Sequence, residues 1–500
     1  MLHHAVYQVK ASRTPEACQE SWEKQALPPN HPDIAPTLGF PLAVTTTEIL
    51  TFIVEPRHQL LQTHQSQLDI LHWKELAPLS RTQWHWNPDY SPFINTLAYL
   101  WHTRGKGTYV ALSKKGVALF IPFINPQFQN VASASLLKQY EKARRREKRE
   151  KLLPDVKQWN TVGCLLANED PIQVRGGGWG VFLNLFREAA KKLKEPRDFF
   201  FHRYDHPQAT HTGHEPNYHM TGRFDAPIPG METFQSHLSQ SQNRWYPILG
   251  NATGPLYVER PIPTADEWQL ATQSYFPPDC HNGYIDALKT IVPWKDRTNQ
   301  AVWRGGINQC GFNPKTNQRL ALVVKGKERT DLMNVGLTGW GTRMKMEFRY
   351  RQAPKIGKTP ISYLSKHYGI DKASPLTRQE QQAYKYIIDL PGNNENPGYR
   401  FAWEMLAGFC ILWVGEPFGA PSGEGERRLN LWFWPQLKAW EHYVPVKWDL
   451  SDLEERIRWC QAHDEEAKQI AENARSLAEQ LFQKKTLIQV VVDALQAEPL

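Results

Sequence analysis

The sequence is poor in cysteine, and its cysteines do not cluster. Six cysteines are spread over 500 residues, and no Cys-x-x-Cys pair occurs. Zinc ribbons and redox dithiols need such pairs, and secreted domains held by disulfides contain cysteine at higher density. The pattern therefore argues against these classes and predicts buried free thiols in a reducing compartment.

Targeting and membrane-spanning segments are also missing. The N-terminus, MLHHAV, lacks the basic and then apolar order of a signal peptide. The most apolar early stretch, residues 39–54, contains Thr45, Thr46, Thr47 and Glu48, so it is too short and too polar to cross a bilayer. The final three residues, EPL, are not a retention signal. We expect a soluble, cytoplasmic protein.

The chain has little net charge for its size. Its 59 basic and 51 acidic side chains give a net charge of +8, which is compatible with nucleotide phosphates, nucleic acid or acidic glycans. Residues 141–151 interleave acids and bases at helical spacing, so a solvated helix face is favoured over a nucleic-acid-binding one. Gly176–Gly180 precedes a helix but lacks the Gly-x-Gly-x-x-Gly order after a strand, so a flexible loop is favoured over a phosphate cradle.

The hydrophobic pattern predicts an α/β protein of two or three domains. Residues 109–113 and 117–122 are typical of a β-hairpin, and a helix at 181–193 and a strand at 199–201 follow. After residue 290, apolar runs alternate with helical segments, which indicates a parallel sheet with helices on both faces. The strands expected there are Ala301–Trp303, Leu320–Val324, Tyr386–Leu390 and Cys410–Val414, and the helices are Tyr399–Gly408 and Leu453–Phe482, the last with a capping box of Ser451 and Glu454.

Two expected strands end in residues that are suited to chemistry. Asp205 follows the apolar run 199–201, and a carboxylate at the exit of a strand can act as a general base. An Asx turn is the structural alternative, and this segment alone favours it. Arg304 precedes Gly305 at the end of another strand, where a guanidinium can bind phosphate through two parallel bonds or form a structural ion pair.

A third candidate, Arg400, begins the helix that follows the turn-rich loop 391–399. The N–H groups and the dipole at a helix start favour an anion, so a basic side chain is unfavourable there unless an anion is present. On physical grounds Arg400 is therefore a stronger candidate than Arg304.

Together these segments resemble glycosyltransferase family 90, the family of the fungal capsule-associated proteins and the animal protein O-glucosyltransferases. The resemblance covers residues 195–485 and is strongest from residue 380 onward. It rests on the order of four motifs, which are Asp205-x-Pro207, Pro293-Trp294-Lys295 with Trp303-Arg304-Gly305, Tyr384-Lys385-Tyr386 through Arg400-Phe401 to Leu406, and Trp434-Pro435-Gln436-Leu437-Lys438 through Asp449-Leu450.

The resemblance implies an α/β fold of the GT-B type with two Rossmann-like lobes. The corresponding division is an N-terminal extension (1–70), a region with the acceptor-side lobe (71–290), a donor-binding lobe (291–485) and a C-terminal tail (486–500). It further implies inverting transfer of glucose or xylose from a UDP-sugar to a hydroxyl of a protein or glycan acceptor, with no metal or other cofactor and no nucleic-acid partner. The implied site residues are Asp205 as the catalytic base and Arg304, Gly305, Gly392, Tyr399 and Arg400 for the donor.

The sequence departs from the family pattern at several positions. Tyr204 precedes Asp205 where members commonly have arginine, and Gly306-Ile307-Asn308 replaces a small polar residue and a second arginine. Residues 418–428 form an insert, and residues 1–190 match no motif that would identify an acceptor.

Two alternatives remain open. A metal-dependent hydrolase or transferase would use the histidines between His202 and His219 together with Glu215, although their spacing matches neither His-Glu-x-x-His nor a pair on one helix face. A non-catalytic protein that binds glycan or nucleic acid on a transferase fold is the other, because fold does not guarantee activity.

Overall fold

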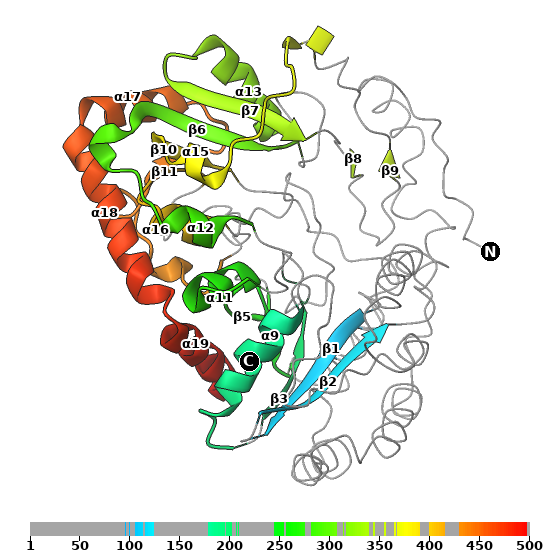
Figure 1. Cartoon of the computed structure of the whole chain (residues 1–500). Helices are drawn as coiled ribbons and strands as arrows, with labels where there is room; N and C mark the ends of the chain where they lie inside the picture. The colour runs from blue at the N-terminus through cyan, green and yellow to red at the C-terminus, as the bar shows by residue number, and fades with distance from the viewer. Residues whose placement is uncertain are drawn as a thin grey trace, which may run out of the picture. The chain divides into compact units, whose positions relative to one another are not determined.

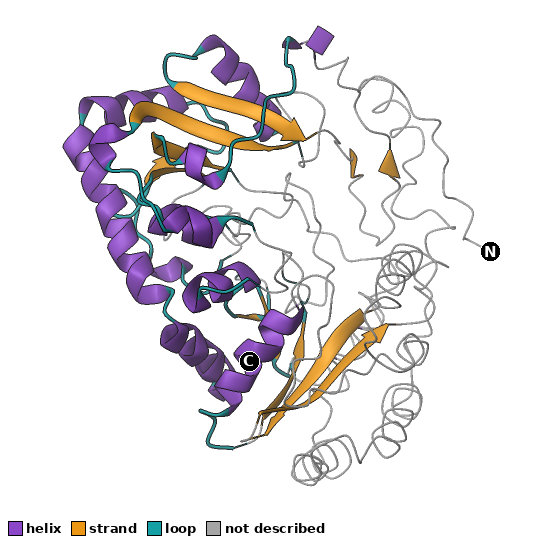
Figure 2. Ribbon diagram, viewed as in Figure 1, coloured by secondary structure: helices purple, strands orange, loops and turns teal. Residues whose placement is uncertain are grey.

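The computed structural model describes a little under half of the chain and is shown in Figures 1 and 2. The described residues are 96, 100, 106–113, 116–124, 179–195, 197–202, 207, 209, 245–254, 257–275, 282–307, 314, 317–339, 344–345, 355–356, 365–366, 368–390, 400–415 and 430–497. They fall into two compact units, with divisions between Ala265 and Asp266 and between Thr486 and Leu487. We call residues 266–486 the C-terminal unit and the remaining described residues the N-terminal unit.

A parallel sheet forms the centre of the C-terminal unit. Its strand order is β12-β11-β10-β6-β7, and all four neighbouring pairs are parallel. The strands are β6 (Thr298–Gly306), β7 (Met333–Gly339), β10 (Tyr384–Asp389), β11 (Cys410–Val414) and β12 (Val444–Val446). The predicted strands at Ala301–Trp303, Tyr386–Leu390 and Cys410–Val414 are thus confirmed, and the mixed α/β class with them.

The helices of this unit include one that the sequence pattern misassigned. Leu320–Val324, predicted as a strand, lies inside helix α13 (Gln318–Glu328). Asn317 begins this helix, because its side chain accepts a hydrogen bond from the backbone N–H of Leu320. The other helical segments are α11 (Ala265–Thr272), α12 (Tyr284–Leu288), η6 (Trp294–Asp296), α15 (Arg378–Gln381), α16 (Phe401–Leu406), η8 (Trp434–Gln436), α17 (Leu453–Ala462) and α18 (Asp464–Leu481).

Helices cover both faces of the sheet, which explains why the central parts of its strands are apolar. On one face, Trp303 and Tyr386 belong to a buried cluster that also contains side chains of α13 and α17. On the other face, Phe401 of α16 contacts Trp413 of β11, with ring centroids 6.1 Å apart. Strands buried on both faces read as continuous hydrophobic runs rather than as alternating patterns.

Two cysteines of this unit are free thiols. Cys410 of β11 and Cys460 of α17 are buried in the cluster, and neither forms a disulfide. Burial and a hydrogen bond with Cys460 raise the pKa of the Cys410 thiol. For these two residues, the predicted buried free thiols are confirmed.

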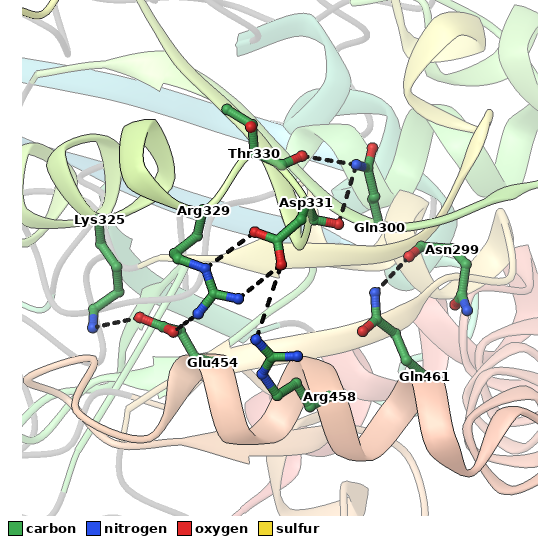
Figure 3. A network of polar contacts seen from close by, with 9 residues as sticks. All are labelled: Asn299, Gln300, Lys325, Arg329, Thr330, Asp331, Glu454, Arg458 and Gln461. Carbon is green, nitrogen blue, oxygen red and sulfur yellow. Dashed lines mark hydrogen bonds and ion pairs between the residues drawn. The ribbon is translucent and has the colours of Figure 1, made fainter.

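The predicted helix 453–482 is two helices, and its capping box is absent. His463 separates α17 from α18, and Asp464 starts α18 with two further acidic residues in the first turn. The residue before α17 is Asp452, whose side chain makes no capping bond. Glu454 instead pairs with Lys325 and Arg329 beyond the end of its own helix, as Figure 3 shows.

Figure 3 also shows how this network joins α17 to the amino ends of two strands. Arg329 donates two hydrogen bonds to Asp331, which precedes β7. Gln461 of α17 donates to the carbonyl oxygen of Asn299 in β6, over 2.8 Å. The network therefore fixes the end of the sheet that lies opposite the strands' carboxyl ends.

A second contact at the amino ends of the strands involves two residues of the family motifs. Lys385 of β10 lies 2.7 and 2.8 Å from the two carboxylate oxygens of Asp464. The indole N–H of Trp294 donates to the same carboxylate, and the Lys385 ammonium lies 5.3 Å from the Trp294 ring centroid. These motif residues thus connect η6, β10 and the start of α18.

The N-terminal unit contains a mixed five-stranded sheet of order β2-β1-β3-β4-β5. The hairpin β1 (Lys106–Ser113) and β2 (Gly116–Ile124) confirms the predicted one, and β3 (Arg197–Phe201) and helix α9 (Trp179–Ala190) confirm the strand and helix expected there. Phe182 and Phe186 of α9 pack on Phe201, with ring centroids 4.7 and 5.1 Å apart. The remaining elements of this unit are β4 (Ile248–Gly250), β5 (Arg260–Pro261) and most of α19 (Lys484–Gln496). A separate antiparallel pair, β8 (Met344–Lys345) and β9 (Lys355–Ile356), belongs to the C-terminal unit.

Candidate functional site

The carboxyl ends of the parallel strands bring the candidate residues of the C-terminal unit to one edge of the sheet. Strand β6 ends in Arg304-Gly305-Gly306, and its neighbour β10 ends at Asp389. The following helices, α13 and α16, begin close to this edge, with Arg319 and Arg400 in or next to their first turns. In open α/β sheets ligands bind at this edge, because the loops that leave the strands surround it.

Arg400 immediately precedes α16, and its side chain is held by two buried acids. Its Nε and Nη2 lie 3.1 and 2.7 Å from Oδ1 of Asp389, and its Nε lies 2.8 Å from Oε1 of Glu404. The Arg400 side chain is 16% exposed, whereas both acids are fully buried. The anions expected at this basic helix start are therefore supplied, at least in part, by the protein itself.

Burial and charge shift the pKa values of this cluster in a consistent way. Burial lowers the pKa of Arg400, but the negative charges of Asp389 and Glu404 outweigh it, so the pKa lies above its ordinary value. Burial and the nearby Asp389 charge raise the pKa of Glu404 to about 8. Burial and the Asp389 charge therefore both favour the protonated form of Glu404.

Arg319 is a second arginine at this edge, which the sequence reasoning missed. It lies in the first turn of α13, is 9% exposed, and donates a hydrogen bond of 2.8 Å to the carbonyl oxygen of Gly306. Its guanidinium lies 5.9 Å from the centroid of the Trp303 ring. Burial and repulsion by Arg400 lower the pKa of Arg319 to about 10, whereas Asp389 acts in the opposite direction. Arg319, Arg400 and Asp389 thus interact electrostatically.

The signal for Arg319 was the same one that selected Arg400. Both are basic residues in or beside the first turn of a helix that follows a strand end. The interpretation of Leu320–Val324 as a strand concealed the start of α13 and therefore concealed Arg319.

Arg304 is engaged by neutral acceptors. Its guanidinium donates to the carbonyl oxygens of Ser374, Trp303 and Asn334 and to the side-chain oxygen of Asn334, over 2.7 to 3.1 Å. Four of its five N–H groups are used in this way. Burial lowers its pKa. The structure thus shows Arg304 joining β6 to β7 and to the segment around Ser374, and its donor-binding role stays a prediction.

Gly305 has a packing role at the same edge. A Cβ atom on Gly305 would lie 2.6 Å from Cζ2 of Trp303, which is closer than real side chains approach. Glycine therefore leaves room for the Trp303 ring, beside which the Arg319 guanidinium lies.

Several sequence-predicted residues lie outside the described part of the chain. These are Asp205, Gly392, Tyr399, the histidines from His206 to His219, Glu215, residues 141–151, Gly176–Gly178 and the insert 418–428. Among the described residues, no group of three potential metal ligands occurs. The metal-site alternative therefore stays untested where its remaining residues lie.

His202 is the described member of the histidine group, and it contacts an acid. Its Nε2 lies 3.2 Å from Oε1 of Glu259, and the same oxygen accepts a 2.7 Å hydrogen bond from the backbone N–H of Ala209. Both side chains are almost fully buried. Glu259 thus connects the two residues that flank, in sequence, the segment containing Asp205.

Residues 268–497 match the protein-family model described as glycosyl transferase family 90. The matched residues include Arg304, Arg319, Asp389, Arg400 and Glu404. The C-terminal part of this chain is thus similar to the family 90 glycosyltransferases.

Curated relatives extend the similarity in two directions. The uncharacterized protein 035R of Invertebrate iridescent virus 3 is 27% identical over 441 residues, which cover 83% of this chain and 37% of that protein. Protein O-glucosyltransferase 3 of Homo sapiens is 28% identical over 204 residues, covering 41% of this chain and 32% of that protein. The chain thus spans about a third of the length of these relatives, and the viral similarity reaches beyond the residues that match the family model.

Two further findings concern a solved structure with partial similarity and the ability of the helices to cross a membrane. Sucrose-phosphate synthase from Thermosynechococcus elongatus aligns at 12% identity over 52% of this chain and 59% of that one, with a TM-score of 0.29. A score at that level carries no argument about the fold. Within the described part of the chain, every helix is too short or too polar to cross a membrane.

Proposed function

We propose that this chain is an inverting glycosyltransferase of the GT-B type that transfers a sugar from a UDP-sugar to a hydroxyl group. The observation that carries the proposal is the pair Arg319 and Arg400 at the carboxyl ends of β6 and β10, inside the region that matches the family 90 model. Two buried guanidinium groups that repel each other are stabilised when a dianion binds nearby. A nucleotide diphosphate has the charge and the acceptor oxygens for this site.

The proposed roles follow from where negative charge develops in the reaction. When the sugar leaves the donor, charge builds up on the diphosphate, and fixed guanidinium donors stabilise it without a metal ion. Arg319 and Arg400 supply these donors, with Arg304, Gly305, Gly392 and Tyr399 as further candidates for the donor site. Asp205 is the proposed base that removes the proton from the attacking hydroxyl.

The sugar and the acceptor are proposed from the relatives. The human relative is named a protein O-glucosyltransferase, which favours glucose as the transferred sugar, with xylose as the second candidate, and a protein or glycan hydroxyl as the acceptor. We infer that neither a metal ion nor nucleic acid takes part.

A binding experiment tests the donor site before any acceptor is known. UDP and a panel of UDP-sugars are titrated into the parent chain and into Arg400→Ala and Arg319→Ala, with thermal stabilisation and calorimetry as readouts. A charge-assisted hydrogen bond contributes about 1.5–3 kcal/mol, so each variant should bind UDP roughly 10- to 100-fold more weakly. Arg458→Ala, which removes the same charge from an exposed position of α17, is the matched control and should bind as the parent does.

Two outcomes would contradict the proposal. If Arg400→Ala and Arg319→Ala bind UDP as tightly as Arg458→Ala does, the diphosphate does not bind at this edge of the sheet. If EDTA abolishes the transfer or hydrolysis of the sugar, the metal-dependent alternative is correct.

A further inference from the structure

The cluster around Arg400 contains one more acid than is needed to balance that arginine. Asp389 and Glu404 both contact the guanidinium, and both are fully buried. With both acids ionised, the three side chains would have a net charge of −1 at the proposed diphosphate site. Such a charge would oppose the binding of an anion.

The guanidinium of Arg400 is oriented by these contacts. Its Nε and Nη2 face Asp389, and its Nε also faces Glu404. Among the described residues, Nη1 of Arg400 has no hydrogen-bond partner. Because guanidinium is planar and presents its donors along fixed edges, holding the Nε side on the protein directs the Nη1 side away from the two acids.

Charged and titratable groups face Glu404 from β10, α12, α15 and the start of α16. Asp389 of β10 disfavours the ionised form of Glu404, whereas Arg400 and Arg378 favour it. Tyr284 of α12 also interacts with Glu404, and burial raises the pKa of Tyr284 to about 12, so this phenol stays neutral. Both oxygens of the Glu404 carboxyl group are buried without a hydrogen-bond partner among the described residues, which also favours the protonated form. Oε1 of Glu404 lies 2.8 Å from Nε of Arg400 but outside hydrogen-bond geometry, so Glu404 contacts this guanidinium through proximity and charge.

We propose that Asp389 and Glu404 are positioning residues for the donor diphosphate: Asp389 anchors Arg400 as the charged partner, and Glu404 holds the same guanidinium as an uncharged acid. Ionisation of Glu404 weakens the binding of the diphosphate, because it places a second negative charge beside the arginine that contacts the phosphate. This inference rests on the proposed function and adds that donor binding weakens when Glu404 loses its proton.

The test measures the dissociation constant of UDP by calorimetry from pH 6.5 to 9.5, for the parent chain and for Glu404→Gln. Glutamine has the shape of the protonated acid and does not ionise, so the variant should bind as the parent does at pH 6.5, within about threefold. At pH 9.5 the parent should bind at least about fivefold more weakly than the variant. UDP ionises equally in both titrations, so its own pH dependence cancels in the ratio of the dissociation constants of the parent and the variant.

A second variant keeps the inference testable if Glu404→Gln does not fold. Asp389→Asn removes the charge that disfavours ionisation of Glu404, so the weakening of UDP binding should shift to lower pH than in the parent. Glu455→Gln, at an exposed position of α17, is the matched control and should keep the parental pH profile.

The outcomes separate this inference from the proposed function. If the parent does not bind UDP at pH 6.5, the proposed function fails and this inference with it. If the parent binds UDP but its ratio to Glu404→Gln is constant from pH 6.5 to 9.5, only this inference fails. A loss of UDP binding by Glu404→Gln at pH 6.5 would overturn it as well, because an ionised carboxylate would then be required.

Discussion

Replacing Arg297 with alanine should destabilise the C-terminal unit strongly, although Arg297 precedes the amino end of β6 and the candidate donor site lies at the carboxyl end of that strand. Its Nη1 and Nη2 each donate a 2.7 Å hydrogen bond, to the carbonyl oxygens of Gly408 and Ala407 at the end of α16. Its Nε donates over 2.9 Å to the carbonyl oxygen of Val292. Arg297 is 6% exposed, so truncation leaves three carbonyl groups poorly solvated.

The magnitude follows from the cost of unsatisfied buried acceptors. Each costs about 1–3 kcal/mol, and water that enters the cavity recovers part of this, so we expect a loss of about 3–5 kcal/mol in the free energy of unfolding. Burial of the charged guanidinium lowers the pKa of Arg297 to about 10, so this charge carries a desolvation cost. Truncation to alanine removes that cost, so the lower half of the range of about 3–5 kcal/mol is favoured.

Urea unfolding followed by tryptophan fluorescence measures the effect. With a slope of ~2 kcal/mol/M, a loss of 3 kcal/mol lowers the midpoint of the transition by about 1.5 M. Lys295→Ala is the matched control, because it removes a basic side chain two residues away from an exposed position, and it should change stability by less than about 0.5 kcal/mol. If the midpoints of Arg297→Ala and Lys295→Ala coincide, the assignment of Arg297 as the residue that holds the end of α16 is wrong.

Two further predictions concern a helix and a buried acid. Gly326→Ala in α13 should lower the melting temperature, because the new Cβ would lie 2.0 Å from Cγ2 of Val335, although alanine normally favours a helix by about 1 kcal/mol. The additional change Val335→Ala should restore part of the loss. An increase in melting temperature for Gly326→Ala alone would contradict this packing. Burial raises the pKa of Asp266 to about 6, so between pH 4 and 6 the unfolded chain releases a proton that the folded chain keeps, and stability falls as pH rises. The free energy of unfolding of Asp266→Asn relative to the parent should therefore increase through this window, by at most about 1.4 kcal/mol per pH unit, and level off above pH 6; a difference that does not vary with pH would refute it.

The strands of the C-terminal unit were predictable from sequence because they are buried on both faces. Ala301–Trp303, Tyr386–Leu390 and Cys410–Val414 are short runs of mostly apolar residues, and each lies in a strand. Leu320–Val324 has the same appearance but belongs to α13. A short apolar run does not distinguish a buried strand from a buried helix turn, and the deciding feature was the cap supplied by Asn317.

The candidate site was predictable only in part. Arg400 was found because a basic residue at a helix start requires an anion, and the structure places Asp389 and Glu404 against it. The pairing of Arg400 with Asp389 depends on how far β10 extends and on the angle at which α16 crosses the sheet. The spacing of residues along the chain gives neither. Arg319 depended on the correct assignment of α13. In both cases the missing information was tertiary.

The motifs that carry the family resemblance serve two ends of the same sheet. Trp294 and Lys385 meet Asp464 at the amino ends of the strands, where they hold the scaffold together, whereas the motif residue Arg400 lies at the carboxyl ends, together with Arg319, which belongs to none of the motifs. The two arginines at the carboxyl ends differ in their surroundings. The acids around Arg400 raise its pKa, whereas burial and the charge of Arg400 lower the pKa of Arg319. If a dianion binds at this edge as proposed, it should improve the environment of Arg319 more than that of Arg400, so we expect Arg319 to provide the larger part of the electrostatic preference for the diphosphate.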